Sequence, residues 1–191
     1  MLNIAFPMLL TTSLFYIIQW TDILILSYFE SPSNIGIYNI ALKISMASTI
    51  VLFSINSIAA PKYSELFTSN KMDEFKKTVK LSSRLIFWLS SPIIIIICFK
   101  IEFILSVFGS DFLNGKIPLL ILLIGQSINM LCGSVGYILM MTNKQMILRN
   151  IVFYAAIINV LLNFILIPKY GIIGSAISST ISLILWNVYS M

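Results

Sequence analysis

Long apolar runs separated by short polar breaks make up almost the whole chain. Six of them are long enough to cross a bilayer, whose core of about 30 Å needs about 20 apolar residues in a helix. They cover residues 4–29, 37–60, 81–100, 117–141, 148–167 and 172–189. The runs are continuous rather than alternating, and helices satisfy their own backbone groups inside lipid, so each run predicts a transmembrane helix. The pattern predicts an all-α, polytopic membrane protein with one six-helix bundle over residues 1–191.

Composition excludes the other classes of protein. Of 191 residues, 59% are hydrophobic and 10% are charged, whereas about 25% of the residues of a soluble domain are charged. An ordinary soluble domain, a disordered chain and a disulfide-stapled secreted module are therefore excluded. The chain has no His, so imidazole metal sites and His proton relays are excluded as well, and we expect no cofactor or metal.

The charged residues predict how the chain is oriented. Residues 61–80 form a basic segment that we expect to be a cytoplasmic loop, either solvated or carrying a short helix on anionic membrane lipids. The cytoplasmic side then carries Lys62, Lys71, Lys76, Lys77, Lys80, Arg84, Lys144 and Arg149, and the opposite side carries Lys100, Lys116 and Lys169. This asymmetry fits the positive-inside rule and places both termini in the cytoplasm. The net charge of +5 therefore sets topology, and we expect no nucleic-acid partner.

Two charged residues lie inside predicted spans. Asp22 comes about seven residues before the end of the first span, and Lys43 about seven residues into the second. Both would lie roughly 10 Å below the external surface. Because charges inside membranes usually face a bundle interior or a water-filled cavity, we predict an Asp22–Lys43 ion pair or a shared hydrated site. The alternative is that Lys43 reaches the headgroups and Asp22 lines a wet vestibule.

Other polar residues recur at helical spacing within the spans. Gln19 precedes Asp22 by almost one turn, Asn39 precedes Lys43 by one turn, and Gln126 and Asn129 share a face of the fourth span. These stripes could line a common cavity, or make interhelical hydrogen bonds worth about 0.6–2 kcal/mol each. For Asn159 and Asn163, in the fifth span, we favour the structural role. The candidate pathway residues are Asp22, Lys43, Gln19, Asn39, Gln126 and Asn129.

No set of residues typical of an enzyme is present. A Gly-rich phosphate loop, paired catalytic carboxylates and a nucleophile–His arrangement are all missing from the sequence. We therefore predict that the protein is not an enzyme.

Several segments, taken in order, carry a family resemblance. They are WTDILILS (residues 20–27), IGIYNIALK (35–43), APKYSEL (60–66), FGSDF (108–112), LLIGQSIN (122–129), NVLLN (159–163) and LIPKYGIIGSAI (166–177). The series resembles the O-antigen and capsule repeat-unit flippases of the Wzx type, within the multidrug/oligosaccharidyl-lipid/polysaccharide exporter superfamily. Each segment alone is weak, but their order and spacing together are fairly specific, and they cover nearly the whole chain.

The resemblance implies an architecture and an activity. Such flippases have twelve or more helices in two six-helix bundles around a central cavity, and this chain is similar to the C-terminal half. An N-terminal six-helix half would be its partner. The implied activity is to move undecaprenyl-diphosphate-linked oligosaccharide units across the cytoplasmic membrane by alternating access, for O-antigen, capsule or exopolysaccharide biosynthesis. Polysaccharide polymerase machinery would be a further partner, and H⁺ or Na⁺ coupling is implied for relatives.

Side-chain chemistry suggests two roles and leaves alternatives open. Lys43 would suit a lipid diphosphate or an acidic sugar, and Asp22 would suit a coupling ion. A drug/cation antiporter of the same superfamily should have an acidic cavity, which a Lys beside the Asp would weaken. A membrane polysaccharide polymerase or acyltransferase should have Arg or His near the external surface. The chain as given would also be inactive if six helices cannot form a two-bundle cavity.

Overall fold

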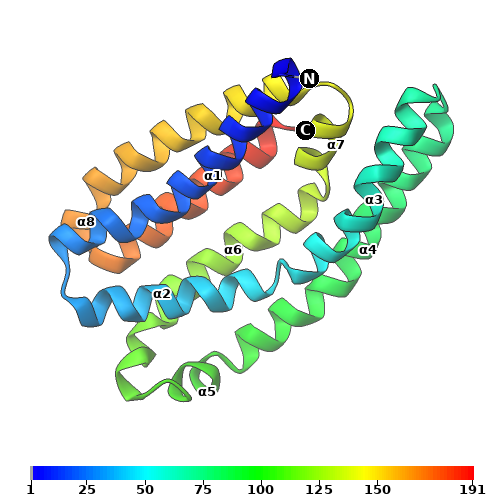
Figure 1. Ribbon diagram of the computed structural model, residues 1–191. Helices are drawn as coiled ribbons and strands as arrows, with labels where there is room; N and C mark the ends of the chain where they lie inside the picture. Colours follow the sequence, from blue (N-terminus) through cyan, green and yellow to red (C-terminus); the bar gives the residue numbers. More distant parts are fainter. Residues whose placement is uncertain (1) are drawn as a thin grey trace.

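The chain folds entirely into helices joined by short turns (Figure 1). The computed structural model describes residues 2–191, and their side chains from residue 8 onward. In chain order the elements are α1 (Leu2–Phe29), α2 (Pro32–Ala47), α3 (Ile50–Thr68), α4 (Met72–Phe99), α5 (Ile101–Ser106), the 3₁₀ helix η1 (Ser110–Gly115), α6 (Lys116–Cys132), α7 (Val135–Met141) and α8 (Gln145–Tyr189). The described residues contain no strand, which confirms the predicted all-α membrane bundle.

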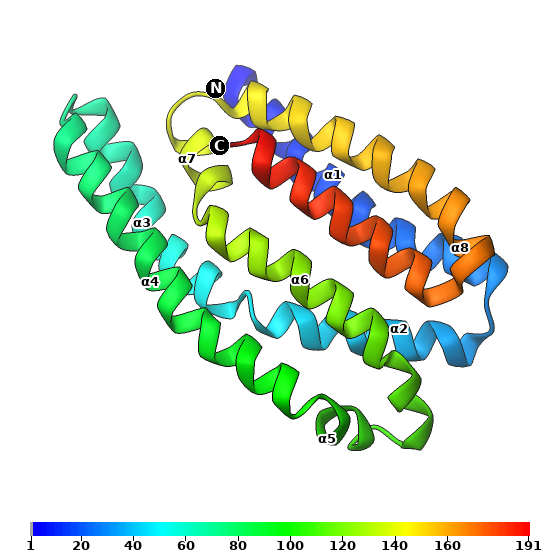
Figure 2. The same ribbon diagram turned by 180° about the vertical axis from the view of Figure 1, so that it is seen from behind.

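Membrane-spanning segments follow from the lengths of these helices. Four helices are long and apolar enough to cross a bilayer alone, and the bent pair α2–α3 would make a fifth span. Helix α8 has 45 residues, and at 1.5 Å per residue that is about twice the thickness of a bilayer core. It turns back on itself at Gly171, so it provides two of the passes (Figures 1 and 2).

The two arms of α8 lie side by side because the backbone reverses at a glycine. Gly171 has φ 55° and ψ −133°, a conformation that other residues adopt only with strain. Pro168, just before it, removes a backbone donor and weakens the helix at that point. At Gly174 a Cβ atom would overlap the backbone carbonyl of Leu166, so glycine also permits the close crossing of the two arms.

The predicted continuous helix over residues 37–60 is wrong. Helix α2 begins earlier, at Pro32, where Ser31 Oγ accepts a hydrogen bond from the Asn34 amide, and it ends at Ala47. Ser48 and Thr49 then donate their hydroxyls to the carbonyls of Ser45 and Met46, at 2.6 and 2.7 Å. These side-chain bonds compete with the helical backbone bonds, and α3 continues at an angle of 46° to α2.

The predicted span over residues 117–141 is also interrupted. Helix α6 ends at Cys132, and Gly133 adopts φ 69° before α7 begins at Val135. A Cβ at Gly133 would lie 2.7 Å from the hydroxyl oxygen of Ser83 on α4. The break therefore permits a close approach between α4 and the α6–α7 junction.

Residues 61–80, predicted as a loop that is either solvated or carries a short helix, are mostly helical. Helix α3 continues to Thr68, and α4 begins at Met72, so the connection is a tight turn in which Asn70 has φ 58°. The aromatic rings of Tyr63 and Phe75 meet edge to face across this hairpin, with centroids 5.9 Å apart. The lysines of this segment are exposed on the outer surface. A run of exposed lysines is typical of a loop, but here it belongs to a packed helical hairpin.

The two ends of the bundle are packed differently. At the end that holds α5 and η1, a continuous apolar core includes Leu26, Tyr38, Leu105 and Leu119, each fully buried. Both termini lie at the opposite end, and the tip of the α3–α4 hairpin points the same way (Figures 1 and 2). Near the end that holds the termini, α3 packs against α4 and α7.

Replacing Gly174 with Ala tests the close crossing of the two α8 arms. The new methyl group would overlap backbone that has no flexible side chain to yield, and overpacking costs about 1–3 kcal/mol. We expect a clear fall in the thermal unfolding midpoint of the purified protein. Gly36→Ala is the matched control, because a Cβ there would have nothing within 4 Å, and alanine favours a helix by up to about 1 kcal/mol. Equal midpoints for the two variants would contradict the proposed crossing.

Candidate functional site

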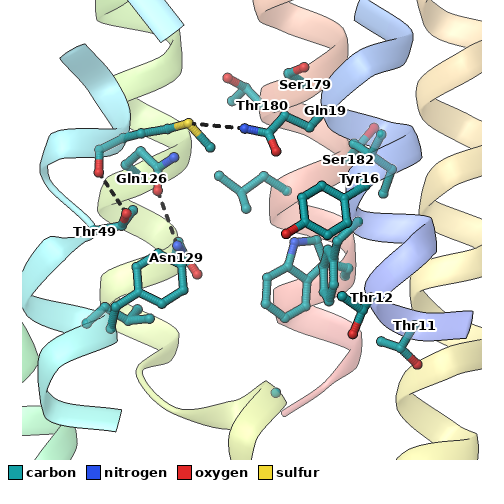
Figure 3. Close-up of a pocket in the computed structure, with 18 of the residues that line it drawn as sticks. Thr11, Thr12, Tyr16, Gln19, Thr49, Gln126, Asn129, Ser179, Thr180 and Ser182 are labelled. Carbon is teal, nitrogen blue, oxygen red and sulfur yellow. Dashed lines mark hydrogen bonds between the residues drawn. The ribbon is translucent and has the colours of Figure 1, made fainter. Parts of the chain in front are cut away.

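A cavity of about 540 Å³ opens between α1, the α2–α3 junction, α6 and the second arm of α8. Three of the residues that line it, Tyr16, Gln19 and Asp22, follow one face of α1 at helical spacing. Gln126 and Asn129 line it from α6, and Ser179, Thr180 and Ser182 from α8 (Figure 3). The lining includes apolar and aromatic residues as well, so the cavity has both polar and apolar walls.

Asp22 lies at the inner end of this cavity and is only 2% exposed. The Tyr38 hydroxyl donates to Asp22 Oδ2 at 2.8 Å, and the Ser179 hydroxyl donates to the same oxygen. Asn163 Nδ2 donates to Oδ1 at 2.7 Å, and Asn159 Nδ2 donates to it at 3.4 Å. One carboxylate thus joins α1 to α2 and to both arms of α8.

Four neutral donors account for how a carboxylate is held inside the bundle. A buried charge is costly unless it is hydrogen-bonded or paired, and bonds to an ionised acceptor are roughly twice as strong as neutral ones. Asn163 Nδ2 also donates to Asn159 Oδ1 at 3.1 Å, whereas Asn163 Oδ1 is buried and has no hydrogen-bond partner among the residues that the structure describes. The site therefore contains an unsatisfied oxygen beside a carboxylate.

The predicted Asp22–Lys43 ion pair is wrong. Lys43 is exposed on α2, and no ion pair joins it to Asp22 within the described part of the chain. The reason is geometric, because the residue of α2 that faces Asp22 is Tyr38, five positions earlier. Lys43 and Asn39 also lie outside the set of residues that line the cavity. Four of the six candidates, Asp22, Gln19, Gln126 and Asn129, do line it.

Two of those residues form a pair on one wall. Asn129 Nδ2 donates to Gln126 Oε1 at 3.2 Å, and each residue is 8% exposed. Gln19, on α1 across the cavity, approaches Met46 of α2, with its Nε2 atom 3.5 Å from the sulfur atom (Figure 3). In this pair, the donor Gln126 Nε2 and the acceptor Asn129 Oδ1 have no protein partner among the described residues.

Sequence reasoning missed half of the donors to Asp22. For Asn159 and Asn163 the favoured prediction, an interhelical hydrogen bond, is confirmed, because both donate from α8 to the carboxylate of Asp22 on α1. Tyr38 and Ser179 were not singled out. The depth of Tyr38 in the membrane could have indicated it. Tyr38 lies nine residues after the end of α1 and Asp22 lies seven residues before that end, so the two residues should lie at similar depths. No spacing rule shows that the second arm of α8 returns to place Ser179 there.

A family model named MatE matches residues 7–165 of the chain. The chain belongs to the MatE family. The match covers the helices that supply Asp22, Tyr38, Asn159 and Asn163. The chain is therefore a multi-pass membrane protein of a known family, and the buried carboxylate of Asp22 lies within the region that matches the MatE model. No solved structure matches the chain.

Three relatives of this MatE protein are named as flippases or as proteins of glycan or polysaccharide biosynthesis. The chain is 26% identical to the probable low-salt glycan biosynthesis flippase Agl15 of Haloferax volcanii, over 87% of this chain and 36% of the relative. It is 24% identical to the probable flippase AglR of the same organism, over 91% and 37%. It is 25% identical to the capsular polysaccharide biosynthesis protein CapF of Staphylococcus aureus, over 78% and 38%. The chain thus spans little more than a third of the length of these relatives.

Replacing Asp22 with Ala should destabilise the bundle. The change leaves buried donors on α2 and α8 without an acceptor, and each such donor costs about 1–3 kcal/mol, so the thermal midpoint of the purified protein should fall by several degrees. The control is Lys43→Met, which removes an exposed charge and should change stability by no more than about 0.5 kcal/mol. Equal losses for the two single variants, with no further loss in the double variant, would instead indicate an ion pair.

Proposed function

We propose that this chain is half of a transporter that moves lipid-linked oligosaccharides, carried on undecaprenyl diphosphate, across the cytoplasmic membrane. The observation that carries the proposal is a cavity inside a MatE bundle that lies between Asp22 and the end of the bundle that holds the termini, with a packed apolar core at the other end. A one-sided cavity is what one state of an alternating-access cycle requires. Two relatives named as flippases, one of them in glycan biosynthesis, support the substrate class.

The end of the bundle that holds the termini would face the cytoplasm. Lys76, Lys77, Lys80 and Arg84 are exposed on α4, in the hairpin whose tip lies at the same end of the molecule as the termini (Figure 1). Basic residues concentrate on the cytoplasmic side of membrane proteins. The cavity would then lie on the side of the compartment in which lipid-linked sugars are assembled.

A second six-helix half would complete the transporter. The relatives are almost three times as long as the matched region. Helix α1 exposes Tyr16, Ile17, Trp20 and Leu24, and Lys43 is exposed on α2 well inside the predicted membrane region. A lysine at that depth is costly against lipid, so we propose that the N-terminal half covers this side and lines a shared space with Lys43.

Asp22 would bind the coupling cation, either H⁺ or Na⁺. The buried, unpartnered Asn163 Oδ1 lies on the side chain that donates to the carboxylate, and oxygen ligands suit a hard cation. Cation binding at Asp22 would change the bonds that hold α2 and both arms of α8 together. That coupling would link ion binding to the conformation of the bundle.

A drug/cation antiporter is the second candidate, and one observation favours it. The lysine expected to weaken an acidic cavity lies outside it, so an organic cation would meet Asp22 without a competing charge. Against this proposal, Asp22 is only 2% exposed, so its carboxylate is accessible to a small cation such as H⁺ or Na⁺ but not to a bulky organic cation. Among the relatives, the names of Agl15 and CapF refer to glycans and polysaccharides.

Depleting the full-length transporter in its own cell separates these candidates. A flippase predicts that lipid-linked oligosaccharides accumulate on the cytoplasmic leaflet, which a membrane-impermeant glycan-modifying reagent added to oriented vesicles would detect. Unchanged glycan export together with altered resistance to cationic drugs would exclude the flippase and favour the antiporter.

Asp22→Asn should uncouple transport from the ion gradient. Asparagine keeps the shape of the side chain and one acceptor oxygen but loses the charge that binds a cation. In proteoliposomes containing the full transporter, flipping driven by an imposed Na⁺ or pH gradient should fall at least tenfold. Asp111→Asn makes the same chemical change at an exposed site in η1 and should leave the rate unchanged. Gradient-driven flipping that survives Asp22→Asn would remove Asp22 from the coupling mechanism.

A further inference from the structure

The cavity in this half has aromatic walls. Phe15, Tyr16, Phe53, Tyr137 and Trp186 all line it. The rings of Phe15 and Trp186 meet edge to face, with centroids 5.2 Å apart. At Gly136 a Cβ atom would lie 3.3 Å from the Trp186 ring, so glycine gives the indole room at the wall of the cavity. Aromatic faces of this kind pack well against the apolar C–H surfaces of a ligand.

Polar groups on the same walls are neutral amides and hydroxyls. The Gln126–Asn129 pair offers one free donor and one free acceptor, and Gln19 and Tyr16 lie across the cavity from it (Figure 3). A few well-placed neutral polar groups between apolar walls is the usual arrangement of a small-molecule site, and about 540 Å³ is within the usual range of volumes. Such walls match a ligand with many hydroxyl groups and C–H faces.

The charges that line the cavity do not suit an anion. Among the described lining residues, Asp22 is the one with an ionisable carboxylate, and none is a lysine or arginine. A diphosphate in this cavity would lack a countercharge and would be repelled by Asp22 over a few ångströms in a medium of low dielectric constant. Lys43 lies beside Leu42 and Met46, which line the cavity, but it is exposed on a different side of α2.

We infer that this cavity binds the uncharged sugar head of the substrate and excludes its diphosphate, which remains outside it in the shared space that Lys43 would line. Trp186 provides the stacking face, and Gln126 and Asn129 read the sugar hydroxyl or acetamido groups. The inference rests on the proposed function and adds to it which part of the substrate this half recognises. It excludes an acidic sugar as the residue held in the cavity.

Intrinsic fluorescence of the full transporter tests binding directly. Neutral disaccharides, N,N′-diacetylchitobiose and lactose, should produce a saturable change in emission that disappears in Trp186→Phe and persists in Trp88→Phe, whose tryptophan is 69% exposed and outside the cavity. Inorganic pyrophosphate and a glucuronic acid disaccharide should produce no Trp186-dependent change. A Trp186-dependent response to either anion, or none to the neutral sugars, would overturn the inference.

Transport kinetics separate this inference from the proposed function. Gln126→Leu and Asn129→Leu should each raise the KM for the sugar-bearing lipid about tenfold, the effect of one lost hydrogen bond worth about 1.4 kcal/mol. The same variants should leave transport of undecaprenyl diphosphate without sugar unchanged. Equal losses for both lipids would overturn the sugar site while leaving the flippase intact. A wild-type transporter that flips neither lipid would defeat the proposed function, whatever fluorescence shows of sugar binding.

Discussion

The arrangement of the bundle depends on one buried carboxylate. Asp22 on α1 accepts hydrogen bonds from Tyr38 on α2 and from side chains on both arms of α8. Inside a membrane such an acceptor has no water to compensate for a lost partner, so the helices that carry the donors are held at a fixed distance from α1. Because neutral donors satisfy the carboxylate, no lysine is required, and Lys43 is free to face another side of α2.

Two local features of the backbone make this convergence possible. The reversal at Gly171 returns the chain so that Ser179 reaches the same carboxylate as Asn163, and the turn at Ser31 and Pro32 brings Tyr38 back toward α1. Beyond the carboxylate, the breaks after Ala47 and Cys132 redirect two walls of the bundle. The bundle is therefore densely packed on one side of Asp22 and hollow on the other.

This division gives the proposed mechanism a physical basis. The cation site and the cavity share Asp22, so a change in the hydrogen bonds of the carboxylate would be felt by the helices that form the walls. The cavity offers aromatic and amide groups to sugars, while a group of basic residues lies exposed on α4 and at the α3–α4 tip. Neutral recognition in the interior and positive charge at the surface suit a substrate with a sugar head and an anionic lipid.

The sequence by itself determined the class of the protein, because hydrophobic runs of bilayer length allow only helices. It also predicted six residues for one cavity, since polar residues in a span tend to avoid lipid, and four of them line it while Lys43 and Asn39 do not. Only the tertiary structure decided what Asp22 binds. Periodicity gives the face of a helix and its depth but not the rotation of neighbouring helices, so Tyr38 rather than Lys43 faces the carboxylate. A similar limit applies to the basic segment over residues 61–80, which was predicted as a loop with at most a short helix. Its charges predict exposure to water, but the packing of the buried Tyr63 against Phe75 shows that the segment forms a helical hairpin.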